Sequence, residues 1–366
     1  MNFCYHGYMT LTEVSYFSRR LAPFIILLFV VILILFYSFK LVLLFGQLNT
    51  PQVSRLNPVF KELKPIEFTE ATNSAGRTYI MDTVEGEPVT ATDAAKVFLM
   101  PETKFRFGYK EKISLIAKNL GFEGSGLEYV LSPKKTEGIF QDGKRKLEID
   151  ITNFNFKYRQ DIVHSPELFE TNGTPDKESA KNKAVDFLKS IDRYPDDLAL
   201  GRMIVTYMQY DKESSKTAVL EDNKGANMVE VDFFRKNIDE YQILSPNYYN
   251  SQNYVIMVQM GDRGYQVVGA QVQYFEKSEA QVGTYPVIDG KTAFEKLATG
   301  SGYIVAGADI KDKEIPITNM FLAYYDPETY QPYMQPIYVF WNQKLNFVAY
   351  VPAVTDEYIL SYSTVR

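Results

Sequence analysis

The sequence predicts an α+β protein, in which a single N-terminal transmembrane helix precedes tandem modules of one helix plus an antiparallel meander. One uninterrupted apolar run lies near the N-terminus. After it, apolar residues at helical spacing recur ahead of groups of alternating strand-like segments. The chain has 27 Tyr and 25 Phe, and this aromatic content of 14% favours sheet structure. A hydrophobic content of 46% is enough for a body with a real core.

The apolar run extends from Leu21 to Gly46 and carries one charge, Lys40. At about 1.5 Å per residue a helix of this length spans roughly 39 Å, against roughly 30 Å of bilayer hydrocarbon. The run is too long for a cleavable signal peptide and too uniformly apolar for a core helix. We therefore predict an uncleaved signal anchor with the lipid bilayer as its partner. The anchor side chains expected at lipid or its interface are Phe24, Leu28, Ile32, Leu35 and Lys40.

The charges beside the run predict its orientation. Arg19 and Arg20 precede it and favour a cytoplasmic N-terminal tail of residues 1–20. Three basic residues shortly after the run argue weakly the other way, but long C-terminal bodies cross membranes largely regardless of charge. We expect a single-pass protein of the cell membrane with its C-terminal body outside the cytoplasm.

Composition excludes several functional classes. A net charge of −6 gives no support to nucleic-acid binding, which needs a basic face. The only cysteine, Cys4, lies before the apolar run, so a disulfide framework and a thiol nucleophile are excluded from the body. His6 lies in the N-terminal tail, and His164 is the only other histidine; no second His or Cys lies within metal-ligand spacing of His164. We therefore predict no metal site and no cofactor.

No catalytic motif is recognised in the body, and we expect a protein that is not an enzyme. The tightest carboxylate pairs are Asp196-Asp197 and Asp239-Glu240, for which solvated turns are the preferred interpretation. A carboxylate-based hydrolase needs no local motif, so it stays open as the alternative function, together with glycan binding.

The chain after the anchor is predicted to divide into a stalk and three modules. Residues 47–89 carry four prolines without a sustained period and read as an extended stalk. The first α+β module, 90–160, begins with a helix over 92–99 that is capped at Thr92. A second helix follows, with Gly121 as its C′ residue, and Asp142-Gly143 marks a hairpin.

The remaining modules repeat this plan. After a linker, 161–174, the second α+β module covers 175–288: Thr174 caps a helix that begins at Pro175, and four strands follow over 202–210, 228–235, 253–260 and 265–275. The third α+β module, 289–366, has a helix over 289–299 that ends at Gly300 or Gly302. Its strands are predicted over 315–325, 334–341 and 346–351.

Aromatic residues are dense between 324 and 341. The first interpretation is a sheet core with its edge; the second is a platform that stacks on sugar or peptide. The candidate binding surface under the second interpretation is Tyr325, Tyr330, Tyr333 and Trp341.

Five segments of the C-terminal half carry a family resemblance. They are VEVDFFR at 229–235, YPVI at 285–288, KTAFEKLATGSGY at 291–303, FLAYY at 321–325 and MQPIYVF at 334–340. Together they resemble the YycH/YycI regulators of bacterial sensor kinases, especially their YycI-like end, over roughly residues 175 to 355. They also resemble PepSY-type modules, which share the helix-and-meander plan.

The resemblance implies a non-catalytic regulatory or sensory protein that acts on a sensor kinase through its transmembrane helix. Its single anchor and long external body match that plan. The sequence therefore predicts a membrane-anchored binding protein for an envelope partner, with the hydrolase or glycan-binding protein as the alternative.

Overall fold

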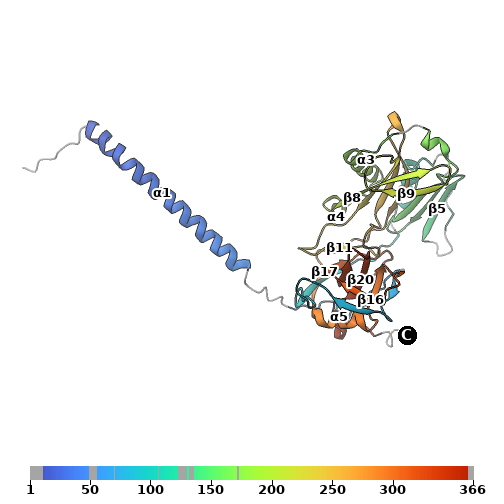
Figure 1. Ribbon diagram of the computed structural model, residues 1–366. Helices are drawn as coiled ribbons and strands as arrows, with labels where there is room; N and C mark the ends of the chain where they lie inside the picture. Colours follow the sequence, from blue (N-terminus) through green and yellow to red (C-terminus); the bar gives the residue numbers. More distant parts are fainter. Residues whose placement is uncertain are drawn as a thin grey trace, which may run out of the picture. The chain divides into compact units, whose positions relative to one another are not determined.

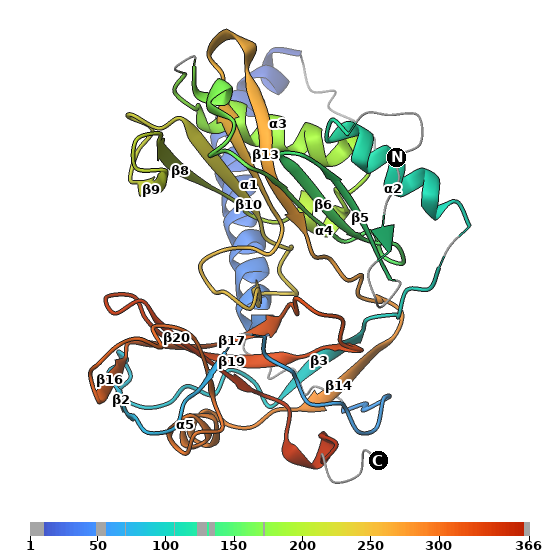
Figure 2. The same cartoon turned by 90° about the vertical axis from the view of Figure 1, so that its right-hand side faces the viewer.

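The structure is a computed structural model that describes residues 11–48, 56–69, 71–105, 107–122, 130–131, 136–170 and 173–361. The chain divides into two compact units, Met1–Ser54 and Arg55–Arg366. The first contains helix α1, and the second, hereafter the body, contains the strands and the other helices (Figures 1 and 2).

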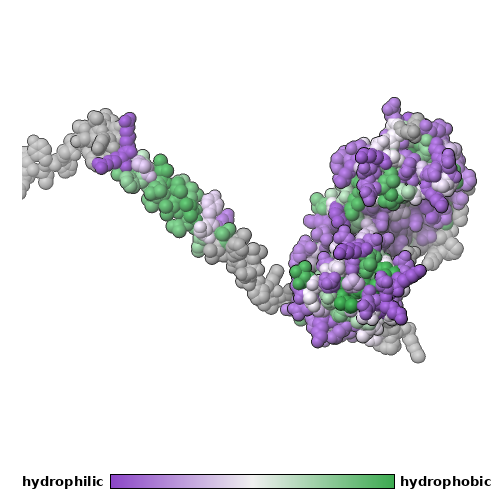
Figure 3. Space-filling view, viewed as in Figure 1, coloured by the Kyte–Doolittle hydropathy of each residue, from purple (hydrophilic) through white to green (hydrophobic). Residues whose placement is uncertain are grey.

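Helix α1 (Leu11–Leu48) contains a 23-residue stretch, Arg19–Leu41, that is long and apolar enough to cross a membrane. Apolar residues cover this part of the helix in Figure 3. The expected anchor residues Phe24, Leu28, Ile32, Leu35 and Lys40 all lie in it with exposed side chains. Exposed apolar side chains on every face suit a helix surrounded by lipid.

One lobe of the body, hereafter the nine-stranded lobe, is an antiparallel sheet in the order β4-β5-β6-β7-β13-β12-β10-β8-β9. Its strands are β4 (Val130–Leu131), β5 (Glu137–Asp142), β6 (Arg145–Asp150), β7 (Phe156–Gln160), β8 (Met203–Asp211), β9 (Lys216–Leu220), β10 (Met228–Phe233), β12 (Tyr254–Gln259) and β13 (Tyr265–Val272). Helices α2 (Tyr109–Asn119), α3 (Lys177–Ser190) and α4 (Asp196–Ala199) bury apolar residues against one face. On the opposite face the short helix η1 (Pro166–Phe169) covers one end. Helix η2 (Gly261–Arg263) lies between β12 and β13.

The other lobe, hereafter the six-stranded lobe, is built on a sheet in the order β1-β15-β20-β19-β17-β11. Its strands are β1 (Thr72–Asn73), β11 (Ile243–Leu244), β15 (Tyr303–Ala306), β17 (Asn319–Tyr325), β19 (Pro336–Asn342) and β20 (Phe347–Pro352). Smaller sheets join β14 (Val282–Pro286), β3 (Ala94–Leu99) and β18 (Tyr333–Met334), and join β16 (Glu314–Ile317) to β2 (Thr78–Met81). Helix α5 (Gly290–Ala298) packs on one face of the large sheet, and η3 (Asp356–Tyr358) lies near the C-terminus.

Several local predictions are confirmed. Helix α2 ends where Gly121 takes φ 83°, and Asp142-Gly143 joins β5 to β6. Helix α5 ends before Gly300, which has φ 87°. At each of these positions glycine permits a backbone conformation that strains other residues.

Two helix predictions and one strand prediction were wrong in detail. The helix expected over 92–99 is strand β3, because this segment pairs with β14 on one side and β18 on the other. Helix α3 is capped by Asp176, whose carboxylate accepts from the Ser179 N–H at 2.8 Å, rather than by Thr174. The strand expected over 315–325 is two strands in different sheets, β16 and β17.

The observed body also differs from the expected stalk and tandem modules. Within the expected stalk, Leu63 and Tyr79 are buried, and β1 and β2 pair with strands of the six-stranded lobe. Strand β7 of the first predicted module pairs with β13 of the second, and β3 pairs with β14. The body is therefore a mixed helix-and-sheet structure in which strands from distant parts of the chain share sheets.

Candidate binding groove

The structure places the four aromatic residues predicted to form one surface in different surroundings. Tyr325 is 2% exposed and lies in the core with Phe68, so its placement on a binding surface is corrected: β17 is flanked by β19 and β11, and its side chain points to a covered face. Tyr330 donates its hydroxyl to the Met100 carbonyl at 2.9 Å. The ring centroid of Tyr333 is 5.0 Å from that of Phe60. Trp341 alone lines the groove described next.

A groove of about 470 Å³ runs beside strand β17. The residues that line it are Val89, Ala91, Glu240, Tyr241, Gln242, Tyr248, Asn319, Met320, Phe321, Leu322 and Trp341. Most of these are apolar or aromatic, and Glu240 is the single formal charge among them. A concave surface with large aromatic residues and few charges is typical of sites that bind another molecule.

Aromatic contacts build one wall of the groove. The centroid of the Tyr248 ring lies 5.8 Å from that of Trp341, and Tyr249 packs edge-on against Tyr248 at 5.1 Å. The Trp341 indole Nε1–H donates to the Tyr249 hydroxyl at 3.3 Å. Both tyrosines belong to residues 245–253, hereafter the 245–253 loop, which joins β11 to β12.

The phenol of Tyr241 contributes a polar hydroxyl group to the groove. Burial, with the neighbouring Glu240 as the next cause, raises the pKa of Tyr241 to about 12. The phenol therefore stays protonated, and it hydrogen-bonds the Glu240 side chain.

The floor of the groove is the edge of β17. Strand β11 pairs with Tyr324 and Tyr325 only, and the N–H groups of Tyr324 and Asp326 donate to the carbonyls of Gln242 and Leu244 at 2.8 Å. Backbone groups that point to the same side of a strand recur at every second residue. Met320 and Leu322 therefore present N–H and C=O groups on the side of β11, beyond the reach of its two residues.

Met320 and Leu322 are nearly buried as whole residues, at 5% and 3% exposed, and their side chains pack beneath the sheet with α5. Both residues line the groove. Within the described residues, no strand pairs with this side of β17 at Asn319–Leu322.

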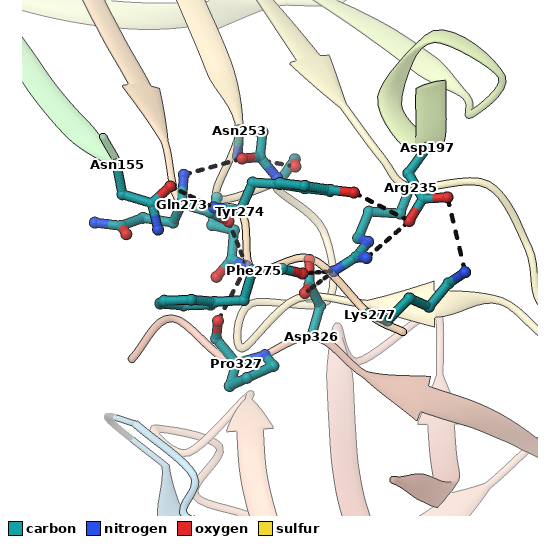
Figure 4. A network of polar contacts seen from close by, with 12 residues as sticks. Asn155, Asp197, Arg235, Asn253, Gln273, Tyr274, Phe275, Lys277, Asp326 and Pro327 are labelled. Atoms are coloured by element: carbon teal, nitrogen blue, oxygen red, sulfur yellow. Dashed lines mark hydrogen bonds and ion pairs between the residues drawn. The ribbon is translucent and has the colours of Figure 1, made fainter. Parts of the chain in front are cut away.

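A buried polar network joins the two lobes close to this edge (Figure 4). Arg235 follows β10 and is 3% exposed. Its guanidinium donates to Asp326 at 2.9 Å, to Asp197 at 2.7 Å and to the Phe275 carbonyl at 3.0 Å. The ring of Tyr274 lies 4.6 Å from the guanidinium carbon.

This network sits at the end of the groove strand. Asp326 directly follows β17, so Arg235 ties the end of β17 to α4 and β10 of the other lobe. Burial is the largest influence on the pKa of Asp326 and raises it, while Arg235 lowers it. The carboxylate pairs named from the sequence thus have structural partners: Asp197 binds Arg235, and Asp239 binds Lys96.

A second cavity of about 690 Å³ lies in the nine-stranded lobe, between α2, α3 and the sheet. Its lining includes the basic residues Arg145, Lys183 and Arg263 and one carboxylate, Asp186. The Arg145 guanidinium already bonds Asp142 and the Leu120 carbonyl. His164, in the linker before η1, pairs with Asp161 at 2.6 Å and lines neither cavity.

Sequence reasoning missed Tyr241 and Tyr248, which lie in segments without a clear period. It also gave no role to Glu230 and Asp232, although the segment VEVDF places two acids on one face of a predicted strand. That alternation in an otherwise apolar strand was the available signal.

No family model matches the chain, and no curated protein sequence matches it. Two solved structures align with it at 10% identity. One is an uncharacterised protein from Eubacterium rectale ATCC 33656, with a TM-score of 0.29 over 74% of this chain and 82% of that chain. The other is YycH from Bacillus subtilis, with a TM-score of 0.32 over 75% of this chain. The alignment spans 56% of the YycH chain. At these TM-scores neither alignment carries an argument about fold or function.

Proposed function

We propose that this chain is a single-pass membrane protein whose body lies outside the cytoplasm and binds a partner polypeptide without catalysis. Helix α1 supports the anchoring by its length and apolar composition. Arg19 and Arg20, at the N-terminal end of the apolar stretch of this helix, support a cytoplasmic N-terminus. The groove beside β17 is the proposed binding site.

The observation that carries this proposal is an open strand edge at the bottom of an aromatic groove. An extended peptide can add to such an edge: main-chain hydrogen bonds supply affinity, and pockets for alternate side chains supply specificity. Met320 and Leu322 offer the ladder groups, and Trp341, Tyr248 and Tyr241 offer apolar contact. The proposed ligand is therefore an extended segment of a protein, with apolar or aromatic side chains on one face.

The resemblance of residues 175–355 to the YycH/YycI regulators suggests the class of partner to test first. In that family the partner is a membrane sensor kinase. We propose a sensor kinase of the same membrane as the partner and a regulatory role for its binding.

Site-specific photo-crosslinking in native membranes tests the proposal. A photoreactive residue at Asn319, an exposed position of the groove, is expected to give a discrete adduct with one partner. The matched control is Val219 on β9, which is also an exposed edge strand but belongs to none of the cavities described above. Equal adducts from both positions, or none from Asn319 in a folded protein, would reject the groove as the site.

A synthetic peptide taken from the crosslinked region then tests the binding mode. Methylating the backbone nitrogens that face β17 should abolish binding, whereas methylating the alternate nitrogens should be tolerated. Equal losses from both sets would mean that the backbone is not what the groove recognises.

The alternative hydrolase needs two carboxylates that face one pocket. Glu230 and Asp232 form a carboxyl pair on β10, but Asp232 is 1% exposed and neither lines the two cavities above. We therefore propose binding rather than hydrolysis as the function of the body.

A further inference from the structure

Two carboxyl groups lie side by side on the sheet face opposite the helices. Glu230 and Asp232 alternate along β10 with Val229, Val231 and Phe233, which pack under the helices. Residues two apart on a strand share a face, so the two carboxyl groups are neighbours. Asp232 is 1% exposed, and Glu230 is half-buried.

The strands that flank this pair offer it no positive charge. In the sheet register Asp232 stands opposite Tyr254 on β12 and Ile204 on β8, and Glu230 stands opposite Ile256 and Thr206. Besides Glu230 and Asp232, the charged groups that influence the pKa of Tyr254 are Arg159 on β7 and Glu328, which follows β17. Arg159 itself pairs with Glu148 at 3.6 Å. Within the described residues, neither Glu230 nor Asp232 forms an ion pair.

The 245–253 loop covers the carboxyl pair. The Ser251 N–H donates to the Asp232 carboxyl at 2.8 Å, and the Ser251 hydroxyl donates to the Phe233 carbonyl at 2.6 Å. The Asn250 side chain donates to Glu230. Burial, with Glu230 as the next cause, raises the pKa of Asp232 to about 7, and burial also raises the pKa of Glu230. The bonds from Ser251 and Asn250 lower these pKa values, but burial outweighs them.

The same loop forms the aromatic wall of the groove. Tyr248 and Tyr249 contact Trp341, and Asn250 and Ser251, the next two residues, bond the carboxyl pair. The loop begins at Ser245, whose carbonyl accepts from the Tyr350 hydroxyl at 3.1 Å. Few residues therefore separate the carboxyl pair from the groove wall, and a shift of Asn250 and Ser251 must move Tyr249.

We infer that the Glu230–Asp232 pair is a proton-dependent latch: its protonated form holds the 245–253 loop on β10 and keeps the groove wall packed on Trp341. The inference rests on the proposed function only for the consequence, a pH-dependent binding site. The hydrogen bonds from Asn250 and Ser251 favour the ionised carboxyl groups, so the motion is inferred from burial and from the repulsion between the two groups. When both carboxyl groups ionise in an apolar site, desolvation and mutual repulsion favour entry of water, and the loop that excludes water must move.

Trp341 reports this motion directly, because it is the only tryptophan of the chain. We expect its fluorescence in the full chain, held in detergent micelles, to shift towards the emission of a solvated indole as the pH rises through about 7. Burial raises the pKa of the adjacent Tyr248 above its ordinary value, so that phenol does not titrate in this range.

Two variants assign the transition to the carboxyl pair. Asp232→Asn should keep the low-pH emission at every pH, because an amide does not ionise. Glu230→Gln should move the midpoint to lower pH, since it removes the neighbouring negative charge. Asp239→Asn, an exposed carboxyl paired with Lys96, should leave the transition in place, and so should His164→Asn.

A constant Trp341 emission in a protein that circular dichroism shows to be folded would overturn the latch. A transition that survives in Asp232→Asn would also overturn it. If Asp232→Asn does not fold, the midpoint of Glu230→Gln decides. The Asn319 crosslink distinguishes the two proposals. A crosslink of equal yield below and above the transition would reject the coupling between latch and groove but support the binding site. A fluorescence transition without any crosslink would support the latch and reject the binding site.

Discussion

At the residue scale, two buried ionisable groups of one segment, Arg235 and Asp232, differ in whether they have a partner of opposite charge. Arg235 is surrounded by two carboxylates, a carbonyl and an aromatic ring. Asp232, three residues earlier, has one backbone N–H and a second carboxyl. Burying a charge is costly unless it is paired, so Arg235 stays charged and Asp232 keeps its proton to unusually high pH.

Asp232 makes the stability of the body depend on pH. Its pKa is about 7 in the folded protein against an ordinary value of 3.8, so the folded state holds this proton where the unfolded state has lost it. The contribution is fully present below the ordinary value and is lost as the pH rises through about 7. Asp232→Asn should therefore be more stable than the parent at alkaline pH, by roughly 1 to 3 kcal/mol.

Urea unfolding below pH 3.8 and above pH 7 measures this difference. The gain from Asp232→Asn should shrink as the pH falls from about 7 and disappear below 3.8, where the parent carboxyl is neutral in both the folded and the unfolded state. A gain or loss of equal size at both values would show that the substitution acts through packing instead.

Arg235→Met should be among the most damaging single substitutions in the body. It leaves the buried Asp326 carboxylate without its cation, and breaking such a pair costs roughly 3 to 5 kcal/mol. The matched control is Lys96→Met, because the Lys96–Asp239 pair is about half exposed and exposed pairs contribute about 1 kcal/mol or less. Similar unfolding midpoints for the two variants would contradict the role of Arg235 as the joint between the lobes.

At the element scale, the sequence predicted helix ends correctly where the backbone conformation requires glycine. It failed where strand pairing decided the secondary structure. Gly121 and Gly300 end helices because a left-handed backbone favours glycine there. The segment 94–99 contains Ala94, Ala95 and Lys96, which suit a helix, yet it forms β3. Strand β14 pairs with β3 from Ala94 to Phe98 and β18 pairs with its last two residues, and that tertiary pairing outweighs the local preference.

Gly300 offers a test at this scale. It has φ 87°, its carbonyl accepts from the Asn73 side chain at 2.6 Å, and an added Cβ would lie 2.7 Å from the Ala75 Cβ. Gly300→Val should destabilise the body by roughly 1 to 3 kcal/mol through backbone strain, with the close contact added.

Gly76 is the matched control, since it has φ 81° and nothing within 4 Å of an added Cβ. Gly76→Val should suffer the backbone strain alone, and the difference between the two thermal midpoints isolates the contact with Ala75. Unchanged melting of Gly300→Val would reject the structural role of Gly300.

At the scale of the whole molecule, we propose that helix α1 anchors the protein in the membrane and that the body binds the partner. Arg19 and Arg20 begin the candidate span in α1 and predict that the body lies outside the cytoplasm. Protease added to intact spheroplasts should therefore digest the body and leave a fragment that contains α1. Protection until the cells are lysed would reverse the orientation.

The sequence by itself determined the features that depend on neighbouring residues. The span in α1, the Asp142-Gly143 hairpin, the ends of α2 and α5 and most strands of β10 to β20 follow from composition, turn chemistry or period over a few residues. It also indicated Trp341 as part of a binding surface, although that function is still a prediction.

Only the tertiary structure decided which segments share a sheet and which side chains meet. It brought residues 56–69 and 71–89 into the body, joined β7 to β13, buried Tyr325, and placed Tyr248 against Trp341 across 93 positions of the chain. Among the strands that the structure describes, none pairs with the β11 side of Asn319–Leu322, because β11 ends after two residues. Strand pairing and burial are free energies summed over residues far apart in the sequence, so no local pattern encodes them.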